Sequence, residues 1–104
     1  MALLGNPFVF ETKKQLSNEE LMQALRVDIA GELEAIIGYE AHAMATNDTR
    51  AKKVLQHIAD EEKQHVGELQ QLLDILNPQE AQNIQKGRQS VTQQQQSNFQ
   101  APMQ

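Results

Sequence analysis

The chain has 104 residues, which is enough for one small domain, and it contains no Cys, which excludes disulfides, thiolate metal ligands and a cysteine nucleophile. Nine basic against 14 acidic residues give a net charge of −5, the wrong sign for a nucleic-acid-binding protein. No apolar run is long enough to cross a membrane. Only 4% of the residues are aromatic, so an aliphatic core is expected, which favours helices. The composition predicts a soluble, cytosolic and mostly helical protein.

Residues 1–16 are predicted to form an N-terminal extension, and the first long helix is predicted to begin directly after it. Ser17 and Glu20 have the spacing of a capping box, in which each side chain bonds the backbone N–H of the other residue. Apolar side chains then recur at helical spacing: Leu21, Leu25, Ile29, Leu33, Ile36 and Ile37. The pattern predicts a helix that continues to about Ala45.

A second long helix is predicted to follow a short turn. Asp48 can cap its N-terminus, because an aspartate side chain accepts hydrogen bonds from the first free backbone N–H groups of a helix. Apolar residues again follow at helical spacing: Ala51, Val54, Leu55, Ile58, Ala59, Val66, Leu69, Leu72, Leu73 and Leu76. The helix is expected to end near Asn77, because Pro78 disfavours helical geometry in the residue before it.

The segment after the second helix is predicted to form a short third helix. Asn77 and Glu80 repeat the capping signal around Pro78, and Gly87 is expected to end this helix. Residues 17–87 are therefore predicted to form one domain, a helical hairpin with a short third helix. Residues 88–104 include four consecutive glutamines, Gln93–Gln96, and are predicted to be a disordered tail or linker.

A hairpin of two helices cannot bury its two apolar stripes completely. Each helix covers only one side of the stripe on the other, and so thin a core supplies about 3–5 kcal/mol at most. The sequence therefore predicts an all-α homo-oligomer, in which two antiparallel hairpins dimerise into a four-helix bundle.

Three polar residues interrupt the apolar stripes. Glu32 lies on the stripe of the first helix, and Glu62 and His65 lie on the stripe of the second at i, i+3 spacing. A buried ionised carboxylate costs several kcal/mol unless it is paired or bound to a metal. No Lys or Arg shares either stripe, since Arg26, Lys52, Lys53 and Lys63 all fall off it. The pattern indicates that a bound cation supplies the missing positive charge.

The positions along the hairpin predict that these three residues meet. With the turn between Asn47 and Asp48, Glu32 lies about 15 residues before it, Glu62 about 15 after it and His65 about 17 after it, at a rise of about 1.5 Å per residue. In an antiparallel hairpin, the three side chains are therefore expected at nearly the same level.

One Glu and one Glu-x-x-His pair are half of the ligand set of a carboxylate-bridged di-iron bundle. Two copies of the hairpin complete the set, and four carboxylates balance the charge of two divalent ions. Oxygen and imidazole ligands suit iron, with manganese, zinc or calcium as substitutes. Glu62 is predicted to bridge the metals, and Glu32 and His65 to act as terminal ligands. The alternative is a non-enzymatic helical assembly module, in which a structural metal site or buried polar groups fix the register.

The stretch Glu32-Leu33-Glu34-Ala35 with Tyr39, followed by Asp60-Glu61-Glu62-Lys63-Gln64-His65, resembles the encapsulated ferritins of the ferritin-like superfamily. The resemblance covers residues 20–77. It implies a ferroxidase that oxidises iron(II) with oxygen at a di-iron centre between two chains, with the dimers assembled into a ring. It also implies an encapsulin shell protein as partner, which stores the mineral, and a cytoplasmic location inside that nanocompartment.

The resemblance assigns roles to individual residues. Glu32, Glu62 and His65 match the ferroxidase ligands, and Tyr39 matches a tyrosine that lines the centre. Glu34 matches one of two glutamates at a metal entrance site and is a candidate for a secondary metal site, whereas Gly31 replaces the other. Gly38 stands where an aromatic residue is often found. His42 and His57 lie off the stripes and are expected to be solvated.

Overall fold

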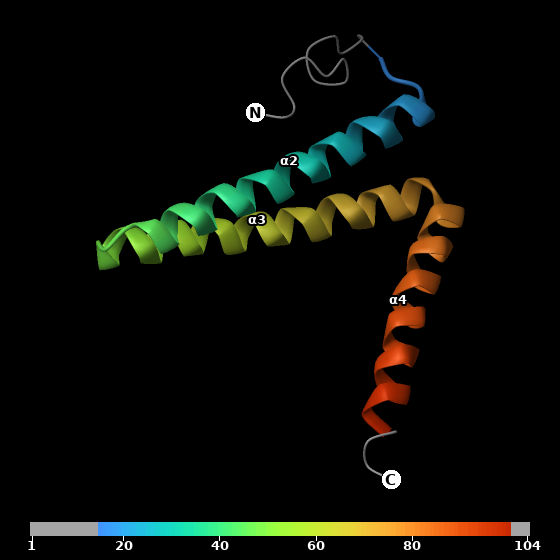
Figure 1. The fold of residues 1–104 in the computed structure, drawn as a ribbon. Coiled ribbons are helices and arrows are strands. Elements are labelled where there is room, and N and C mark those ends of the chain that lie inside the picture. The colour runs from blue at the N-terminus through green and yellow to red at the C-terminus, as the bar shows by residue number, and fades with distance from the viewer. Residues whose placement is uncertain (1–14, 101–104) are drawn as a thin grey trace.

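The computed structural model describes residues 15–100. This range contains three α-helices, α2 (Asn18–Ala45), α3 (Thr49–Leu76) and α4 (Pro78–Gln100), and no strand. Helices α2 and α3 lie side by side and antiparallel, and α4 leaves the hairpin at the end of α3 and projects away from it (Figure 1). The predicted all-α fold with its long hairpin is confirmed. None of the helices within the described range is both long and apolar enough to cross a membrane.

Both long helices begin where the capping signals predict. Ser17 accepts a hydrogen bond from the backbone N–H of Glu20 at 3.2 Å and donates its own N–H to the Glu20 carboxylate at 3.1 Å, which completes the capping box. Asp48 accepts hydrogen bonds from the backbone N–H groups of Arg50 and Ala51 at 2.9 and 3.1 Å. The Asp48 cap and the hydrogen bond from the Thr46 N–H to the His42 carbonyl at 3.2 Å fix the two ends of the three-residue connection, and so they fix which residues of α2 face which residues of α3.

The third helix is longer than the sequence pattern predicted. Its N-terminus is capped as expected, since the Asn77 side chain accepts a hydrogen bond from the backbone N–H of Glu80 at 3.1 Å. However, α4 does not end at Gly87 but continues to Gln100, so the prediction of a disordered segment from residue 88 is wrong for residues 88–100. A glycine inside a helix costs only about 1 kcal/mol, and the lysine, arginine and glutamines around it favour helix. Residues 1–14 and 101–104 lie outside the described residues.

An ion pair ties the first turn of α4 to α2. The guanidinium group of Arg26 pairs with the Glu80 carboxylate, and its Nε lies 3.4 Å from Oε1. The Asn77 side-chain amide also donates to Glu80, at 3.3 Å. The Glu80 carboxylate at the start of α4 thus contacts both Arg26 on α2 and Asn77 at the end of α3. These contacts stabilise the direction in which α4 leaves the hairpin.

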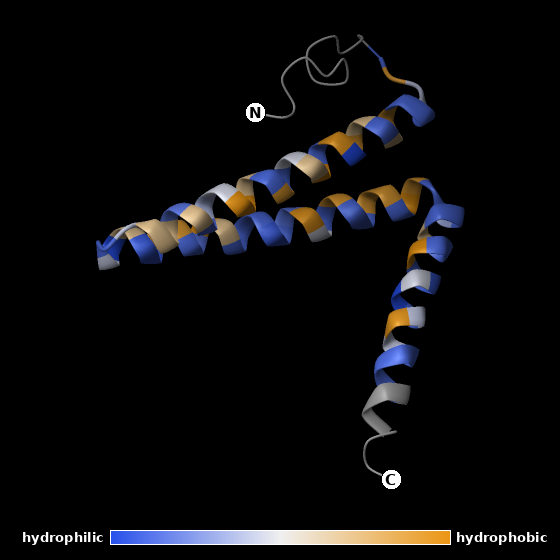
Figure 2. Ribbon diagram, in the orientation of Figure 1, coloured by the Kyte–Doolittle hydropathy of each residue, from blue (hydrophilic) through white to orange (hydrophobic). Residues whose placement is uncertain are grey.

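The core of the hairpin is thin. The buried hydrophobic residues of the described range are Leu25 and Ala43 on α2 and Ala59 and Leu73 on α3. Figure 2 shows hydrophobic residues along both helices of the hairpin, whereas α4 is mainly hydrophilic. Large hydrophobic side chains remain exposed: Leu33, Ile37, Met44, Val54, Leu72, Ile75 and Val91. Apolar surface left open in this way favours association with another chain.

Candidate metal centre

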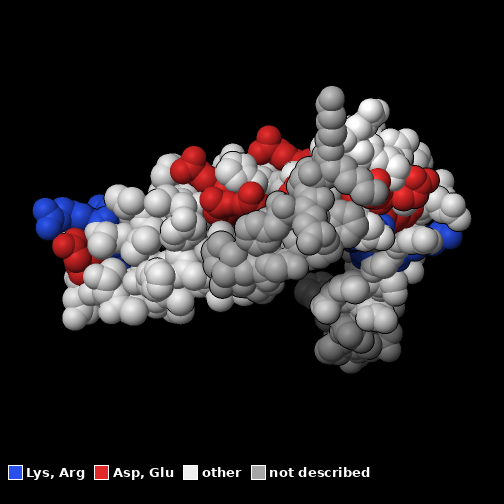
Figure 3. Space-filling model, turned by 90° about the horizontal axis from the view of Figure 1, so that it is seen from above, with Lys and Arg blue, Asp and Glu red and all other residues white. Residues whose placement is uncertain are grey.

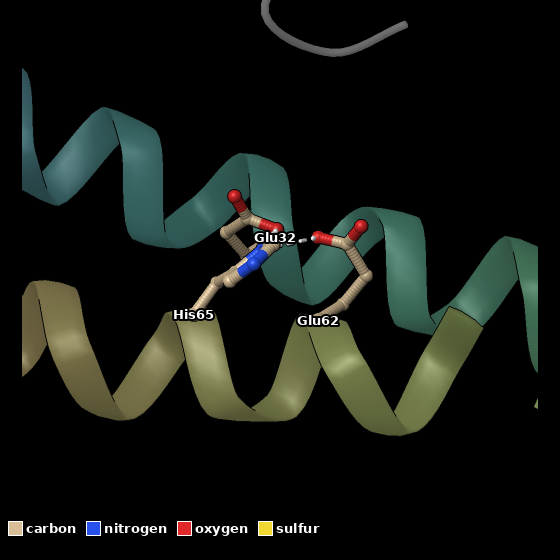
Figure 4. A group of neighbouring side chains, drawn as sticks. All are labelled: Glu32, Glu62 and His65. Atoms are coloured by element: carbon tan, nitrogen blue, oxygen red, sulfur yellow. Dashed lines mark hydrogen bonds and ion pairs between the residues drawn. The ribbon is translucent and has the colours of Figure 1, made fainter. Parts of the chain in front are cut away.

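Glu32, Glu62 and His65 converge in the middle of the hairpin. Glu32 points from α2 toward α3, and Glu62 and His65 lie one helical turn apart on α3 and point back toward it (Figure 4). Nδ1 of His65 lies 3.3 Å from Oε2 of Glu62 and 3.5 Å from Oε2 of Glu32. The sequence predicted that these three residues lie at the same height along the hairpin, and the structure brings them together there.

The spacing of these side chains suits a metal ion. One ligand atom from each residue lies within 4.8 Å of the other two. Oxygen and nitrogen ligands bind zinc or a similar divalent ion at about 2.1 Å, which puts neighbouring ligand atoms about 3 to 3.5 Å apart. The two His65–Glu distances already have this value, so small side-chain rotations suffice to chelate a cation. Two carboxylates and an imidazole form a donor set that suits iron.

Two lysines of the hairpin, Lys63 and Lys52, are engaged elsewhere. Lys63 donates to Glu40 at 2.9 Å and to Asp60 at 3.1 Å. Its hydrogen bond and that of Gln56 hold the pKa of Glu40 below the ordinary value. Lys52 donates to the backbone carbonyl of Ala43 at 2.8 Å.

Figure 3 shows acidic side chains gathered over the middle of one face of the hairpin, with Lys and Arg grouped toward the two ends. No ion pair between a Lys or Arg and either Glu32 or Glu62 occurs in residues 15–100, as the sequence pattern predicted. No Lys or Arg of the described residues therefore neutralises these two carboxylates.

One side of this cluster is open. The side chain of Glu62 is 19% exposed and that of Glu32 is 25% exposed, whereas the His65 imidazole is 50% exposed. A shallow hollow beside the cluster is lined by Glu32, His65, Glu68 and Leu69. A single chain therefore contributes the three side chains from two helices, and the side of the cluster at the hollow is open.

The other predicted site residues lie outside this cluster. Tyr39 follows Glu32 by two helical turns on the same face of α2 and is half-buried. Glu34 is also half-buried, but it lies about 200° around α2 from Glu32. A Cβ atom added at Gly38 meets open space, so the structure leaves room beside Tyr39.

The two remaining histidines of the hairpin are exposed, as expected. His42 is solvent-exposed on α2. His57 is exposed on α3, where its Nε2 lies 3.0 Å from the Glu61 carboxylate. Neither belongs to the cluster that could hold a metal in the described range.

Glu68 is a residue of the hollow that the sequence pattern did not single out. It lies off the apolar stripe of α3, where a charged residue is usually just solvated. Its i, i+3 spacing from His65 is the signal that could have identified it, since residues three apart on a helix are neighbours on its surface.

Three comparisons with known proteins identify the family of the chain. The profile of the family described as "Ubiquinone biosynthesis protein COQ7" matches residues 19–84. The "Encapsulin nanocompartment cargo protein EncC" of Myxococcus xanthus is 38% identical over 76 residues, which are 73% of this chain and 58% of the relative. The "Ferritin-like-encapsulin shell fusion protein" of Pyrococcus furiosus is 40% identical over 86 residues, which are 83% of this chain and 25% of the relative. The chain thus spans less than two thirds of the length of either relative.

A solved structure is similar over almost its whole length. The crystal structure of the encapsulated ferritin domain from Pyrococcus furiosus superposes with a TM-score of 0.75 at 39% sequence identity. The match covers 85% of this chain and 90% of that one. The chain therefore belongs to the COQ7 family of ferritin-like proteins and, within these, to the encapsulated ferritins.

Proposed function

We propose that the protein is a ferroxidase, which oxidises iron(II) to iron(III) with oxygen at a di-iron centre formed between two chains. The observation that carries this proposal is the convergence of Glu32, Glu62 and His65 without a basic partner, on a side of the hairpin that is open. Iron(II) is the substrate of the reaction as well as the ion that these residues hold.

Two copies of the chain complete the site. A two-fold axis beside the open hollow brings a second set of two carboxylates and one imidazole against the first, which is the ligand set of di-iron bundles. Four carboxylates then balance two divalent ions. Glu62 is the least exposed of the three and bridges the ions, whereas Glu32 and His65 bind one ion each. Val54 and Leu72, two exposed hydrophobic residues that lie about 20° around α3 from His65, favour the same association.

The residues of the chain hold the iron ions in position and shield them from water. Two iron(II) ions held side by side can each supply one electron to the same oxygen molecule, which takes up two protons and leaves as hydrogen peroxide while both ions become iron(III). Glu32 and His65 would hold the ions in place because they project from two helices that pack against each other. Leu69 lines the hollow beside them, and an apolar neighbour restricts the access of water to a metal site.

Oxygen uptake tests the proposal. Iron(II) is added to the purified protein in aerated buffer, and oxygen consumption is compared with that of the same buffer without protein. We expect uptake well above the uncatalysed rate, together with bound iron in the protein afterwards. Uptake at the uncatalysed rate contradicts the proposal and favours an assembly module with a structural metal site.

We further propose the setting in which the chain works. Similar proteins are named as encapsulin cargo or are fused to an encapsulin shell, which supports an encapsulin shell as partner and a cytoplasmic location inside that compartment. The dimers assemble into a ring, and the shell receives the oxidised iron for storage. Manganese, zinc or calcium can replace iron at the centre, and Glu34 belongs to a secondary metal site.

Tyr39 is proposed to pass an electron to oxygen-derived species at the centre, and a further iron(II) ion then reduces the oxidised tyrosine. Replacement of Tyr39 by Phe keeps the ring and removes the hydroxyl group that makes tyrosine oxidisable. We expect Y39F to bind as much iron as the wild type but to turn over several-fold more slowly in stopped-flow measurements of iron oxidation. Unchanged oxidation kinetics in Y39F would limit Tyr39 to a packing role.

A further inference from the structure

We propose that Glu68 is the residue that captures incoming divalent cations and passes them to Glu32 and His65. This inference rests on the proposed metal centre and concerns how that centre is filled. The hollow beside the centre is lined by Glu68 together with Glu32, His65 and Leu69. A cation that enters the hollow therefore meets the Glu68 carboxylate next to two of its final ligands.

The Glu68 carboxylate is free to bind a cation. It is exposed on α3, and no hydrogen bond or ion pair within the described range involves it. By contrast, Glu61, which lies on the same side of α3, is paired with His57 at 3.0 Å. An uncommitted carboxylate keeps its full attraction for a cation.

The geometry separates Glu68 from the ligands themselves. The group of side chains close enough to share one ion consists of Glu32, Glu62 and His65, and Glu68 is not a member. Glu68 follows His65 by one helical turn, so its Cβ atom lies about 5–6 Å from that of His65. Glu68 can therefore hold a cation beside the centre without occupying a coordination position in it.

Electrostatics sets the size of the effect. A charged group at the wall of a hollow raises the local concentration of ions of opposite sign and so raises their association rate. For one carboxylate and a divalent cation in a partly solvated hollow, we expect the association rate to be about threefold to tenfold higher at low salt. The gain declines as ionic strength rises, because salt screens exposed charges.

The experiment compares Glu68→Gln with Glu68→Asp and with Glu19→Gln in the full chain. Glu68→Gln removes the charge at nearly constant shape, and Glu68→Asp keeps it. Glu19→Gln makes the same change in net charge at an exposed position of α2, about 20 Å along the helix from Glu32. Two quantities are measured: the association rate of Co²⁺ without oxygen, followed by the absorption of the bound ion, and the steady-state kinetics of iron(II) oxidation.

For Glu68→Gln we expect Co²⁺ to associate about threefold to tenfold more slowly at low salt, and the KM for iron(II) to rise by a similar factor. The kcat and the final amount of bound metal stay at wild-type values. The difference disappears in about 0.5 M salt. Glu68→Asp restores most of the rate, and Glu19→Gln behaves as the wild type.

Three results with the variants would overturn the inference. Equal Co²⁺ association in Glu68→Gln and the wild type removes the capture role. An equal loss in Glu19→Gln assigns the effect to net charge. A lower final amount of bound metal in Glu68→Gln makes Glu68 a ligand. If the wild type binds Co²⁺ but does not oxidise iron, the proposed function fails while the association rates still test Glu68. If the wild type binds no metal, both proposals fail.

Discussion

Replacement of Glu62 by Ala is expected to lower the iron oxidation rate at least about 100-fold, to near the uncatalysed rate. Glu62 is the least exposed of the three converging residues, and its carboxylate lies 3.3 Å from His65. A bridging carboxylate contacts both ions, so its loss removes one bond from each. Oxygen uptake and the iron content of the purified variant are the measurements.

The matched control is Glu61→Ala at the neighbouring position. Glu61 is exposed and pairs with His57, so its removal changes the net charge of α3 equally but leaves the centre intact. Glu62→Ala is expected to fold, because without metal it relieves the repulsion between two nearby carboxylates. Helical content by circular dichroism checks this. Wild-type oxidation by Glu62→Ala, or equal iron content in Glu32→Ala and the wild type, contradicts the site.

Divalent metal is expected to tighten the association of two chains about 100-fold. If each copy supplies half of the ligands, metal binding and dimerisation share a coupling free energy, and each must strengthen the other by the same factor. The open side of the cluster, where the His65 imidazole is 50% exposed, is the structural basis of this coupling. Sedimentation equilibrium with iron(II) under anaerobic conditions, or with chelator, measures both dissociation constants.

His65→Ala provides the control for this coupling. The variant keeps Val54 and Leu72, the exposed hydrophobic residues on the His65 side of α3, so it retains the metal-independent part of the association. Its dimer affinity is expected to respond little to metal. A wild-type protein that remains monomeric when loaded with iron excludes a centre shared by two chains.

The features that the sequence predicted correctly depend on local interactions. The capping box of Ser17 and Glu20 and the cap at Asp48 each join residues no more than three positions apart, so their pattern is visible in the chain. A short connection between two capped helices then fixes the register. For this reason the common level of Glu32, Glu62 and His65 followed from counting residues.

The features that the sequence did not predict depend on contacts between distant segments or on small energy differences. The Arg26–Glu80 ion pair joins residues 54 positions apart and depends on the direction in which α4 leaves α3. The continuation of α4 past Gly87 depends on a balance of about 1 kcal/mol, too small for a single residue to decide. The place of Glu68 at the hollow depends on how α2 packs beside α3.

The exposed residues Leu33, Ile37 and Met44 bear on how many copies can come together. Around α2 they lie about 100° to 140° from Glu32, so they face a different direction from the centre. In a two-fold contact, each partner uses the same surface patch. Such a contact therefore joins two copies and cannot add a third. In the proposed dimer, the partner would cover the side of the hairpin at the centre, and Leu33, Ile37 and Met44 would stay uncovered on each outer flank, where they could join one pair to the next and close a cycle.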